Sequence, residues 1–261
     1  DIPKDLVDPN NPASQFDDYE PTGHNLPGYN PVIEPDPEKV REAAELILQS
    51  ERPVIYSGGG ILKARAASQL RELAEMLDIH VVTTLMNRGG FPDDHPLALG
   101  MPGMHGNYTA VTALQEADLL ITLGARFDDR VTGRLDGFAP DAKIIHADID
   151  PAEFNKVRFA NVAIQGDVGK TINELIAALN QLQQTKQPPD RSEWKSTISG
   201  WKERFPLVYD EWELGEGLKP QYVIEQLRDL TPDDTIVTSG VGQHQMWASQ
   251  FWHFNHPYTW I

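Results

Sequence analysis

The most informative segment of the chain is Leu119 to Gly133: Leu-Leu-Ile-Thr-Leu-Gly-Ala-Arg-Phe-Asp-Asp-Arg-Val-Thr-Gly. Its first five residues are mostly apolar, which is typical of a strand buried on both faces of a parallel sheet. Gly124 ends this strand, so the arginines and carboxylates that follow are expected at the carboxyl edge of the sheet. Open α/β sheets bind ligands at that edge, where unpaired backbone groups remain. A solvated charged turn is the plainer interpretation, and the neighbouring loops favour the ligand site.

The composition narrows the classes of function. A chain of 261 residues with 39 acidic and 22 basic side chains carries a formal charge of -17, which argues against nucleic acid or an anionic membrane as the partner. No cysteine is present, and the histidines form no ligand pattern, so we expect no metal site. Without a signal peptide or an apolar run of about 18 residues, we expect a soluble protein. The first residue is Asp1, which suggests a fragment.

Strands and helices alternate between residues 54 and 182. Apolar runs predict strands at 54–56, 80–84, 119–123, 143–151 and 162–165. Helical periodicity predicts helices at 63–77, 108–116 and 168–182. This alternation predicts an α/β fold with a parallel, doubly wound, Rossmann-like sheet. The loops expected at its carboxyl edge are 58–60, 84–86, 124–130, 148–149 and 166–168.

Two of these loops have residues suited to a nucleotide. The glycine run 58–60 either lets the backbone approach a phosphate or makes a plain tight turn, and the two are equally favoured. Asp148 ends a strand, where a carboxylate commonly accepts hydrogen bonds from ribose hydroxyls. Asp150 is better explained as a helix N-cap.

The segment 85–106 is predicted to be a long irregular loop, rich in Gly, Pro and Met. Loops of this length in a domain are functional or disordered. Met86, Met101 and Met104 could line a flat apolar ligand. His105 could hydrogen-bond that ligand, although a contact with its own loop is the safer interpretation.

The chain divides into four parts. Residues 1–37 are expected to be an extended connector, 38–182 the central domain, 183–190 a polar linker, and 191–261 the start of a truncated second α/β domain. In the last part we expect helices at 191–206 and 220–230, a strand at 235–238, and a helix after the glycine loop 239–242. The aromatics between Trp247 and Trp260 exceed what these elements can cover, so residues 241–261 are predicted to be exposed or mobile.

Five motifs together resemble the large catalytic subunit of the acetohydroxyacid (acetolactate) synthase family. They are Thr-Leu-Met at 84–86, Gly-Met-His-Gly at 103–106, Gly-Ala-Arg-Phe-Asp-Asp-Arg-Val-Thr-Gly at 124–133, Asp-Ile-Asp at 148–150 and Gly-Val-Gly-Gln-His-Gln-Met-Trp at 240–247. Their order and spacing make the resemblance specific, and it covers almost the whole chain.

The resemblance implies a thiamine-diphosphate enzyme with three α/β domains, of which the middle one binds FAD. Residues 54–182 would be that FAD domain, and 191–261 would begin the pyrophosphate-binding domain, where Gln243 and His244 meet the thiamine cofactor. No catalytic or metal-binding residue is implied within the chain, and Mg²⁺ would belong to the intact protein. The implied FAD contacts are Gly58, Gly59, Gly60, Thr84, Leu85, Met86, His105, Gly124, Arg126, Asp128, Arg130, Val131, Asp148, Ile149, Asp167 and Val168.

The family condenses pyruvate with a second pyruvate or 2-ketobutyrate, with decarboxylation, in branched-chain amino acid biosynthesis. The resemblance further implies a homodimer or larger oligomer, a regulatory subunit, and a cytoplasmic location (or a plastid, in a plant or alga). Two departures stand out. Asn25 precedes Leu-Pro-Gly-Tyr where the family commonly has an FAD-contacting arginine, and the domain with the catalytic glutamate is absent, as is the Gly-Asp-…-Asn metal motif. The isolated chain is therefore expected to be inactive.

Two alternatives remain open at this stage. The first is another FAD-containing thiamine enzyme, of the pyruvate oxidase or glyoxylate carboligase type. The second is a non-catalytic dinucleotide-binding module that docks on a partner.

Overall fold

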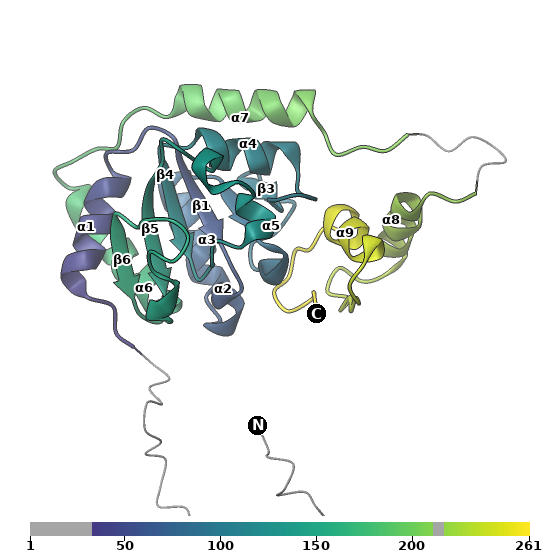
Figure 1. The fold of residues 1–261 in the computed structure, drawn as a ribbon, viewed down its shortest axis with the longest axis horizontal. Helices are drawn as coiled ribbons and strands as arrows, with labels where there is room; N and C mark the ends of the chain where they lie inside the picture. The colour runs from purple at the N-terminus through teal and green to yellow at the C-terminus, as the bar shows by residue number, and fades with distance from the viewer. Residues whose placement is uncertain (1–32, 211–216) are drawn as a thin grey trace, which may run out of the picture. The chain divides into compact units, whose positions relative to one another are not determined.

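The computed structural model describes residues 33–210 and 217–261, and within these ranges six strands form one sheet. The order is β3-β2-β1-β4-β5-β6, and every neighbouring pair is parallel (Figure 1). The bounds are β1 (Pro53–Ser57), β2 (Val81–Thr83), β3 (Ala98–Gly100), β4 (Leu119–Leu123), β5 (Lys143–Asp148) and β6 (Val162–Gln165). The predicted parallel α/β sheet is confirmed. Most of the predicted connector, and Asn25 with it, lies outside the described residues.

Helices cover both faces of the sheet, because alternate strand residues point to opposite faces. Ile55, Ile121 and Ile145 pack into one core with α1 (Pro37–Ile47), α3 (Ala67–Leu77) and α6 (Val168–Leu182). Val54 and Leu120, one residue along, pack into a second core on the other face, with α4 (Tyr108–Glu116) and α7 (Ser192–Arg204). The doubly wound architecture is therefore also confirmed.

Three local expectations differ from the structure. The helix expected at 63–77 is split into α2 (Gly60–Lys63) and α3, because Arg65 adopts a positive φ of 55°. The predicted irregular segment 85–106 contains a 3-10 turn, η3 (Leu85–Asn87), and the edge strand β3, which is too short to produce a recognisable pattern. The strand expected at 235–238 is reduced to one bridge between Val237 and Trp260. The short elements are completed by α5 (Asp129–Thr132), η4 (Leu135–Gly137) and η5 (Pro151–Glu153).

Helix α7, expected to open the second domain, packs on the sheet of the first. Trp194 is 6% exposed and its indole Nε1 donates to the carbonyl of Pro53 at 3.4 Å. Arg191, immediately before the helix, is also 6% exposed and donates to the carbonyls of Ile47 (2.7 Å), Ser50 (3.0 Å) and Leu77 (3.2 Å). One guanidinium thus binds the C-terminal ends of α1 and α3. The domain boundary at 183–190 stays a prediction.

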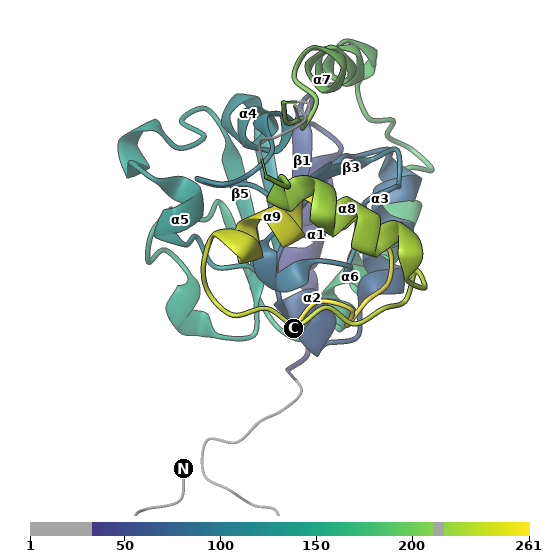
Figure 2. The ribbon, with the colours of Figure 1, turned by 90° about the vertical axis from the view of Figure 1, so that its right-hand side faces the viewer.

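Four large aromatic side chains of the C-terminal segment, Phe251, Trp252, Phe254 and Trp260, are buried. The expectation that the aromatic residues of this segment are uncovered is therefore wrong for these four, and its mobility stays a prediction. Helices α8 (Pro220–Leu230) and α9 (Gln243–Phe251) lie side by side (Figure 2). Trp252, Phe254 and Trp260 form a small core that also contacts Leu85 and Val237. This core exists because the segment docks on the loop after η3, where Asp93 N donates to Phe254 O at 3.1 Å and Phe254 N donates to the Asp93 carboxylate at 2.7 Å.

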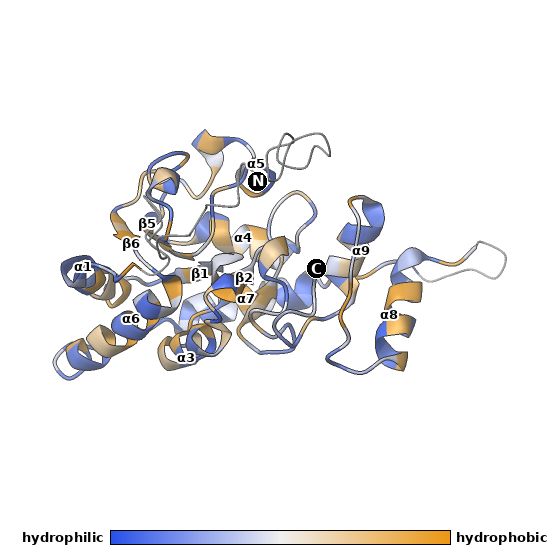
Figure 3. Ribbon diagram, turned by 90° about the horizontal axis from the view of Figure 1, so that it is seen from below, coloured by the Kyte–Doolittle hydropathy of each residue, from blue (hydrophilic) through white to orange (hydrophobic). Residues whose placement is uncertain are grey.

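One apolar surface in this region remains exposed. Val223, Leu227 and Leu230 of α8 are 36%, 50% and 81% exposed, and Figure 3 shows the hydrophobic residues of this helix alternating with hydrophilic ones. Val241 and Ile261 are also exposed. The exposed apolar face of α8 was not predicted, whereas Val241 and Ile261 lie in the segment where uncovered apolar surface was expected.

Candidate functional site

The candidate site lies where the direction of the sheet reverses. From β1 the chain adds β2 and β3 on one side, and then crosses back to place β4 on the other side of β1. Open α/β sheets bind ligands at such a switch point, outside the carboxyl ends of the strands. The glycine run 58–60 and the loop from Gly124 to Arg130 both begin at this point. The predicted loops thus meet at the position where open α/β sheets bind ligands.

The glycine run allows these two loops to touch. A Cβ on Gly58 would lie 2.3 Å from the Gly124 carbonyl oxygen, and one on Gly60 would lie 2.6 Å from Gly124 Cα. The N–H groups of Gly58 and Gly60 donate to the carbonyls of Leu123 and Gly124, each at 3.0 Å. The glycine run therefore brings its backbone close to the loop after β4, whereas the sequence analysis considered a close approach to a phosphate.

The charged residues of the β4 loop form an exposed cluster. Arg126 Nη2 donates to Asp128 Oδ2 at 2.7 Å, and Asp128 Oδ1 accepts the backbone N–H of Arg130 at 3.0 Å as the N-cap of α5. The Arg130 backbone hydrogen bond and nearby Arg126 hold the pKa of Asp128 below its usual value. The side chains of Arg126 and Arg130 are 68% and 74% exposed. Both guanidiniums are accessible to an anionic ligand.

Exposed apolar side chains lie on the loops at this edge of the sheet. Met86 and Met104 are each 70% exposed, and Ile149 is 44% exposed. Met86 lies beside the glycine run, because a Cβ on Gly59 would be 3.2 Å from Met86 Cβ. Met104 lies beside the charged loop, since its N–H donates to the Arg130 carbonyl at 3.0 Å. Two exposed methionines on either side of a switch point suit a flat apolar ligand.

Thr84 provides an unsatisfied group at the end of β2. Its hydroxyl oxygen is buried and has no hydrogen-bond partner within the described residues, while its N–H donates to the Ser57 carbonyl at 3.0 Å. A buried hydroxyl without a partner costs free energy, and a bound ligand would supply the missing partner.

The two acidic loops further along the sheet use their carboxylates locally. Asp148 Oδ1 accepts the N–H of Asp150 at 2.9 Å, and Asp150 in turn caps η5, as the alternative interpretation predicted. Asp167 caps α6 through the N–H of Lys170 at 3.0 Å. The side chain of Val168 is 5% exposed and belongs to the hydrophobic core. Any ligand contact by Val168 would therefore come from its backbone.

The remaining predicted residues connect the site to α9. Gln243 and His244 open this helix and are exposed. At its other end, about 10 Å away at 1.5 Å per residue, Gln250 Nε2 donates to the His105 carbonyl at 2.7 Å. His105 thus contacts α9 through its backbone carbonyl. Its side chain is exposed and makes no hydrogen bond with any other described residue.

Sequence reasoning missed two buried groups under the charged loop. His146 Nε2 lies 3.0 Å from the Ala125 carbonyl, and the Tyr56 hydroxyl donates to the Arg126 carbonyl at 3.3 Å. Burial lowers the pKa of His146 and raises the pKa of Tyr56. Phe127 packs between the two, with ring centroids 5.3 Å from His146 and 5.9 Å from Tyr56. The sequence does show a tyrosine and a histidine within otherwise apolar strands, and this pattern could have identified both residues as buried polar groups.

In residues 33–210 and 217–261, no cluster of three or more His, Asp or Glu side chains is arranged to hold a metal ion. Among the helices in the same ranges, none combines the length and the hydrophobicity that crossing a membrane requires.

Comparison with known proteins agrees with this geometry. Residues 40–175 match the model of the thiamine pyrophosphate enzyme central domain. The acetolactate synthase of Mycobacterium bovis is 50% identical over 261 residues, which is 100% of this chain and 41% of that protein. The large subunit of the Corynebacterium glutamicum acetolactate synthase is 49% identical over 100% of this chain and 40% of its own length. A probable acetolactate synthase large subunit of Methanocaldococcus jannaschii is 41% identical over 269 residues, 100% of this chain and 44% of the relative.

The chain thus spans less than half the length of these relatives, and the family model matches the part that contains the sheet. The switch-point loops at Gly58–Gly60 and Gly124–Arg130 lie within the matched residues. The chain belongs to the thiamine pyrophosphate enzyme family and carries its central domain.

Proposed function

We propose that this chain is part of an acetolactate synthase large subunit. The whole enzyme would join two 2-ketoacids with loss of carbon dioxide, pyruvate with a second pyruvate or with 2-ketobutyrate, in branched-chain amino acid biosynthesis. The observation that carries the proposal is the match of the whole chain to acetolactate synthases from bacteria and an archaeon. The arrangement of the switch-point loops supports a cofactor site in the same part of the chain.

FAD is the cofactor proposed for the sheet edge, and the residues present there fit it. Arg126 and Arg130 would bind its pyrophosphate, because both guanidiniums are exposed. Met86 and Met104 would lie against its flat ring. The unpartnered hydroxyl of Thr84 would gain a hydrogen bond. The carboligation involves no net oxidation, so this FAD would be largely structural.

Thiamine diphosphate and Mg²⁺ are proposed for the whole enzyme. Gln243 and His244, exposed in the first turn of α9, would hydrogen-bond the pyrophosphate of the thiamine cofactor. When bound, that cofactor stabilises the carbanion that forms on decarboxylation. We further propose a homo-oligomer with a regulatory subunit, in the cytoplasm or, for a plant or algal source, in the plastid.

Flavin binding tests the proposed sheet-edge site. Titration of the chain into FAD, followed by flavin fluorescence, should give a saturable signal. Arg126→Ala should weaken binding by about 1.5–3 kcal/mol, roughly ten- to a hundredfold, because a charge-assisted phosphate contact is lost. Arg134→Ala is the matched control. This arginine is 88% exposed and pairs with Asp136, and neither residue is among the proposed FAD contacts. An equal dissociation constant for wild type and Arg126→Ala would contradict the assignment.

The reaction itself is tested on the longer protein that contains this chain. With pyruvate, thiamine diphosphate, Mg²⁺ and FAD, we expect acetolactate as the product. Acetyl phosphate formed with phosphate and oxygen would instead assign a pyruvate oxidase, in which the flavin is redox-active. Absence of both products from a protein loaded with all three cofactors would favour the non-catalytic alternative.

A further inference from the structure

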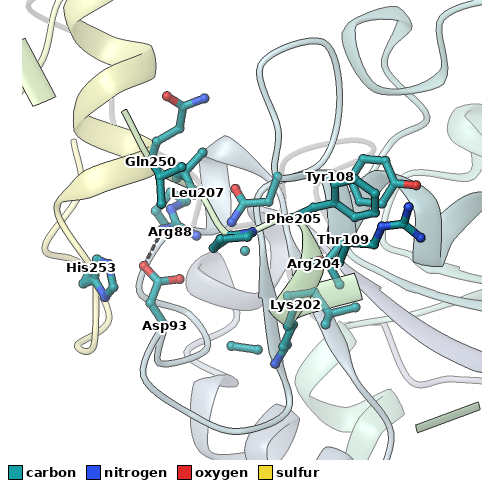
Figure 4. A pocket seen from close by; sticks show the side chains of 16 residues that line it. Arg88, Asp93, Tyr108, Thr109, Lys202, Arg204, Phe205, Leu207, Gln250 and His253 are labelled. Atoms are coloured by element: carbon teal, nitrogen blue, oxygen red, sulfur yellow. Dashed lines mark hydrogen bonds and ion pairs between the residues drawn. The ribbon is translucent and has the colours of Figure 1, made fainter. Parts of the chain in front are cut away.

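A hollow lies beside the sheet, and none of the residues predicted to hold a cofactor lines it. It encloses about 510 Å³ between β3, the start of α4, the end of α7 and the end of α9 (Figure 4). This volume is in the range of sites that bind small organic molecules. Apolar side chains at its rim are partly in water: Phe205, Leu207 and Val208 are 39%, 38% and 73% exposed. A ligand in the hollow would bury this surface.

One wall of the hollow is aromatic. The rings of Tyr108 and Phe205 lie against each other, with centroids 4.0 Å apart. The guanidinium of Arg204 lies 5.4 Å from the centroid of the Phe205 ring. Figure 4 shows these three side chains together on one side of the hollow, with Leu207 and Gln250 across from them. A flat aromatic ligand can pack on such a wall, and the adjacent guanidinium can reach an attached anionic group.

The hollow also carries uncompensated positive charge. Arg88 is paired with Asp93, so these two cancel. Lys202 and Arg204 form no ion pair with any described residue, and the Lys202 ammonium donates instead to the carbonyl of Pro96 at 2.8 Å. Burial lowers the pKa of Lys202, with no carboxylate to offset it. Unpaired cations at a concave apolar site are notable in a chain with a formal charge of -17, and they favour an anionic ligand.

A buried donor adds to this picture. Arg88 is 3% exposed and lines the hollow, and its Nη1 donates to Thr83 Oγ1 at 3.0 Å. Its Nε–H is buried and has no acceptor within the described residues. The side chain of Asn107 also lines the hollow and can donate or accept. The site therefore offers hydrogen-bond donors in addition to positive charge.

We propose that this hollow binds a small aromatic carboxylate, whose ring packs on Phe205 and Tyr108 and whose carboxylate is held on the side of Lys202 and Arg204. The aromatic wall selects a flat apolar body. Lys202 and Arg204, which pair with no carboxylate in the part of the chain that the structure describes, select a negatively charged molecule over a neutral one. The site is independent of the proposed cofactor site, because the two share no residue.

Calorimetric titration with 2-naphthoate tests the site, with 2-naphthalenemethanol as the neutral probe. We expect one molecule of 2-naphthoate to bind per chain. The alcohol should bind at least about tenfold more weakly, because it lacks the charge-assisted contact. Lys202→Met and Arg204→Gln should each weaken 2-naphthoate binding by about tenfold, with little effect on the alcohol. Phe205→Ala should weaken both probes. Lys63→Met, an exposed lysine of α2 outside the hollow, is the matched control and should change neither.

The outcomes separate this site from adsorption on other apolar surface. The exposed face of α8 could take up an aromatic probe, but that binding would not depend on Lys202, Arg204 or Phe205. Equal affinity for the two probes, or unchanged 2-naphthoate binding in both cation variants, overturns the proposal. Neither cation is part of a hydrophobic core, so each variant should keep the wild-type near-ultraviolet circular dichroism. A variant that loses this signal is replaced by Lys202→Gln or Arg204→Met at the same position.

Discussion

Replacing Arg191 with methionine should destabilise the domain far more than the position of this residue directly after a polar linker suggests. The guanidinium is 6% exposed and donates to three main-chain carbonyls, at 2.7, 3.0 and 3.2 Å. Two of these carbonyls end α1 and α3, where a cation also interacts favourably with the helix dipole. Methionine keeps the apolar stem and removes every donor, so the acceptors lose a charge-assisted hydrogen bond.

The magnitude follows from those contacts. A buried acceptor left without a donor costs about 1–3 kcal/mol. Water can enter the space left by the guanidinium and satisfy part of the loss. We therefore expect the free energy of unfolding to fall by about 3 kcal/mol in Arg191→Met, which is less than three full penalties. The free energy of unfolding of Arg191→Lys should lie between those of wild type and Arg191→Met, because one ammonium cannot match the planar fork of the guanidinium.

Urea unfolding followed by tryptophan fluorescence measures this loss. Trp194, one helical turn away and buried on the sheet, reports whether α7 stays docked. Arg52→Met is the matched control, because this arginine is exposed and near the same helix ends; it should change stability by less than about 0.5 kcal/mol. If Arg191→Met unfolds within that same margin of wild type, the network does not hold the two helix ends as described.

Further predictions follow from single contacts. Gly58→Ala should lower the free energy of unfolding by about 1–3 kcal/mol in urea titrations, because its methyl group would meet backbone atoms of Gly124 on the facing loop; a neutral effect would mean that the loops move apart freely. Phe254→Ala should abolish hydrogen-exchange protection in residues 241–261 while the sheet amides stay protected, and retained protection there would show that this small core is not what orders the segment. Burial lowers the pKa of His80 to about 4 from 6.5. The stability that depends on its neutral form is therefore complete above pH 6.5 and is lost as the pH falls toward 4, by about 3 kcal/mol at most. His80→Gln should flatten the dependence of the free energy of unfolding on pH between these values, and identical profiles for the two proteins would contradict this assignment.

Residues near the sheet were predictable because their signals are local. The strand at Leu119–Leu123 is a continuous apolar run, and such runs identify strands buried on both faces wherever they occur. The helices at Tyr108–Glu116 and Val168–Leu182 follow from helical periodicity, which is also a local signal. The alternation of these elements was sufficient to predict which loops share the carboxyl edge, and therefore the neighbourhood of the candidate site.

Other features depend on contacts between distant segments. β3 has three residues and forms only because β2 lies beside it. His146 and Tyr56 support the charged loop from the strands beneath it, and neither shows this role in its own sequence neighbourhood. Which oxygen of a carboxylate is used locally, as in Asp148 and Asp167, is likewise visible only in the folded chain.

The layered α/β architecture and the set of loops at one edge could be predicted from the amino-acid sequence, because both follow from periodicity and strand polarity along the chain. The order of the strands, and with it the position of the switch point between β1 and β4, became evident only in the folded chain. The same is true of where the aromatic C-terminal segment goes. Trp252, Phe254 and Trp260 find their core only where the loop containing Asp93 is brought to them, and burial is a property of the assembled surfaces rather than of a residue's neighbours in sequence.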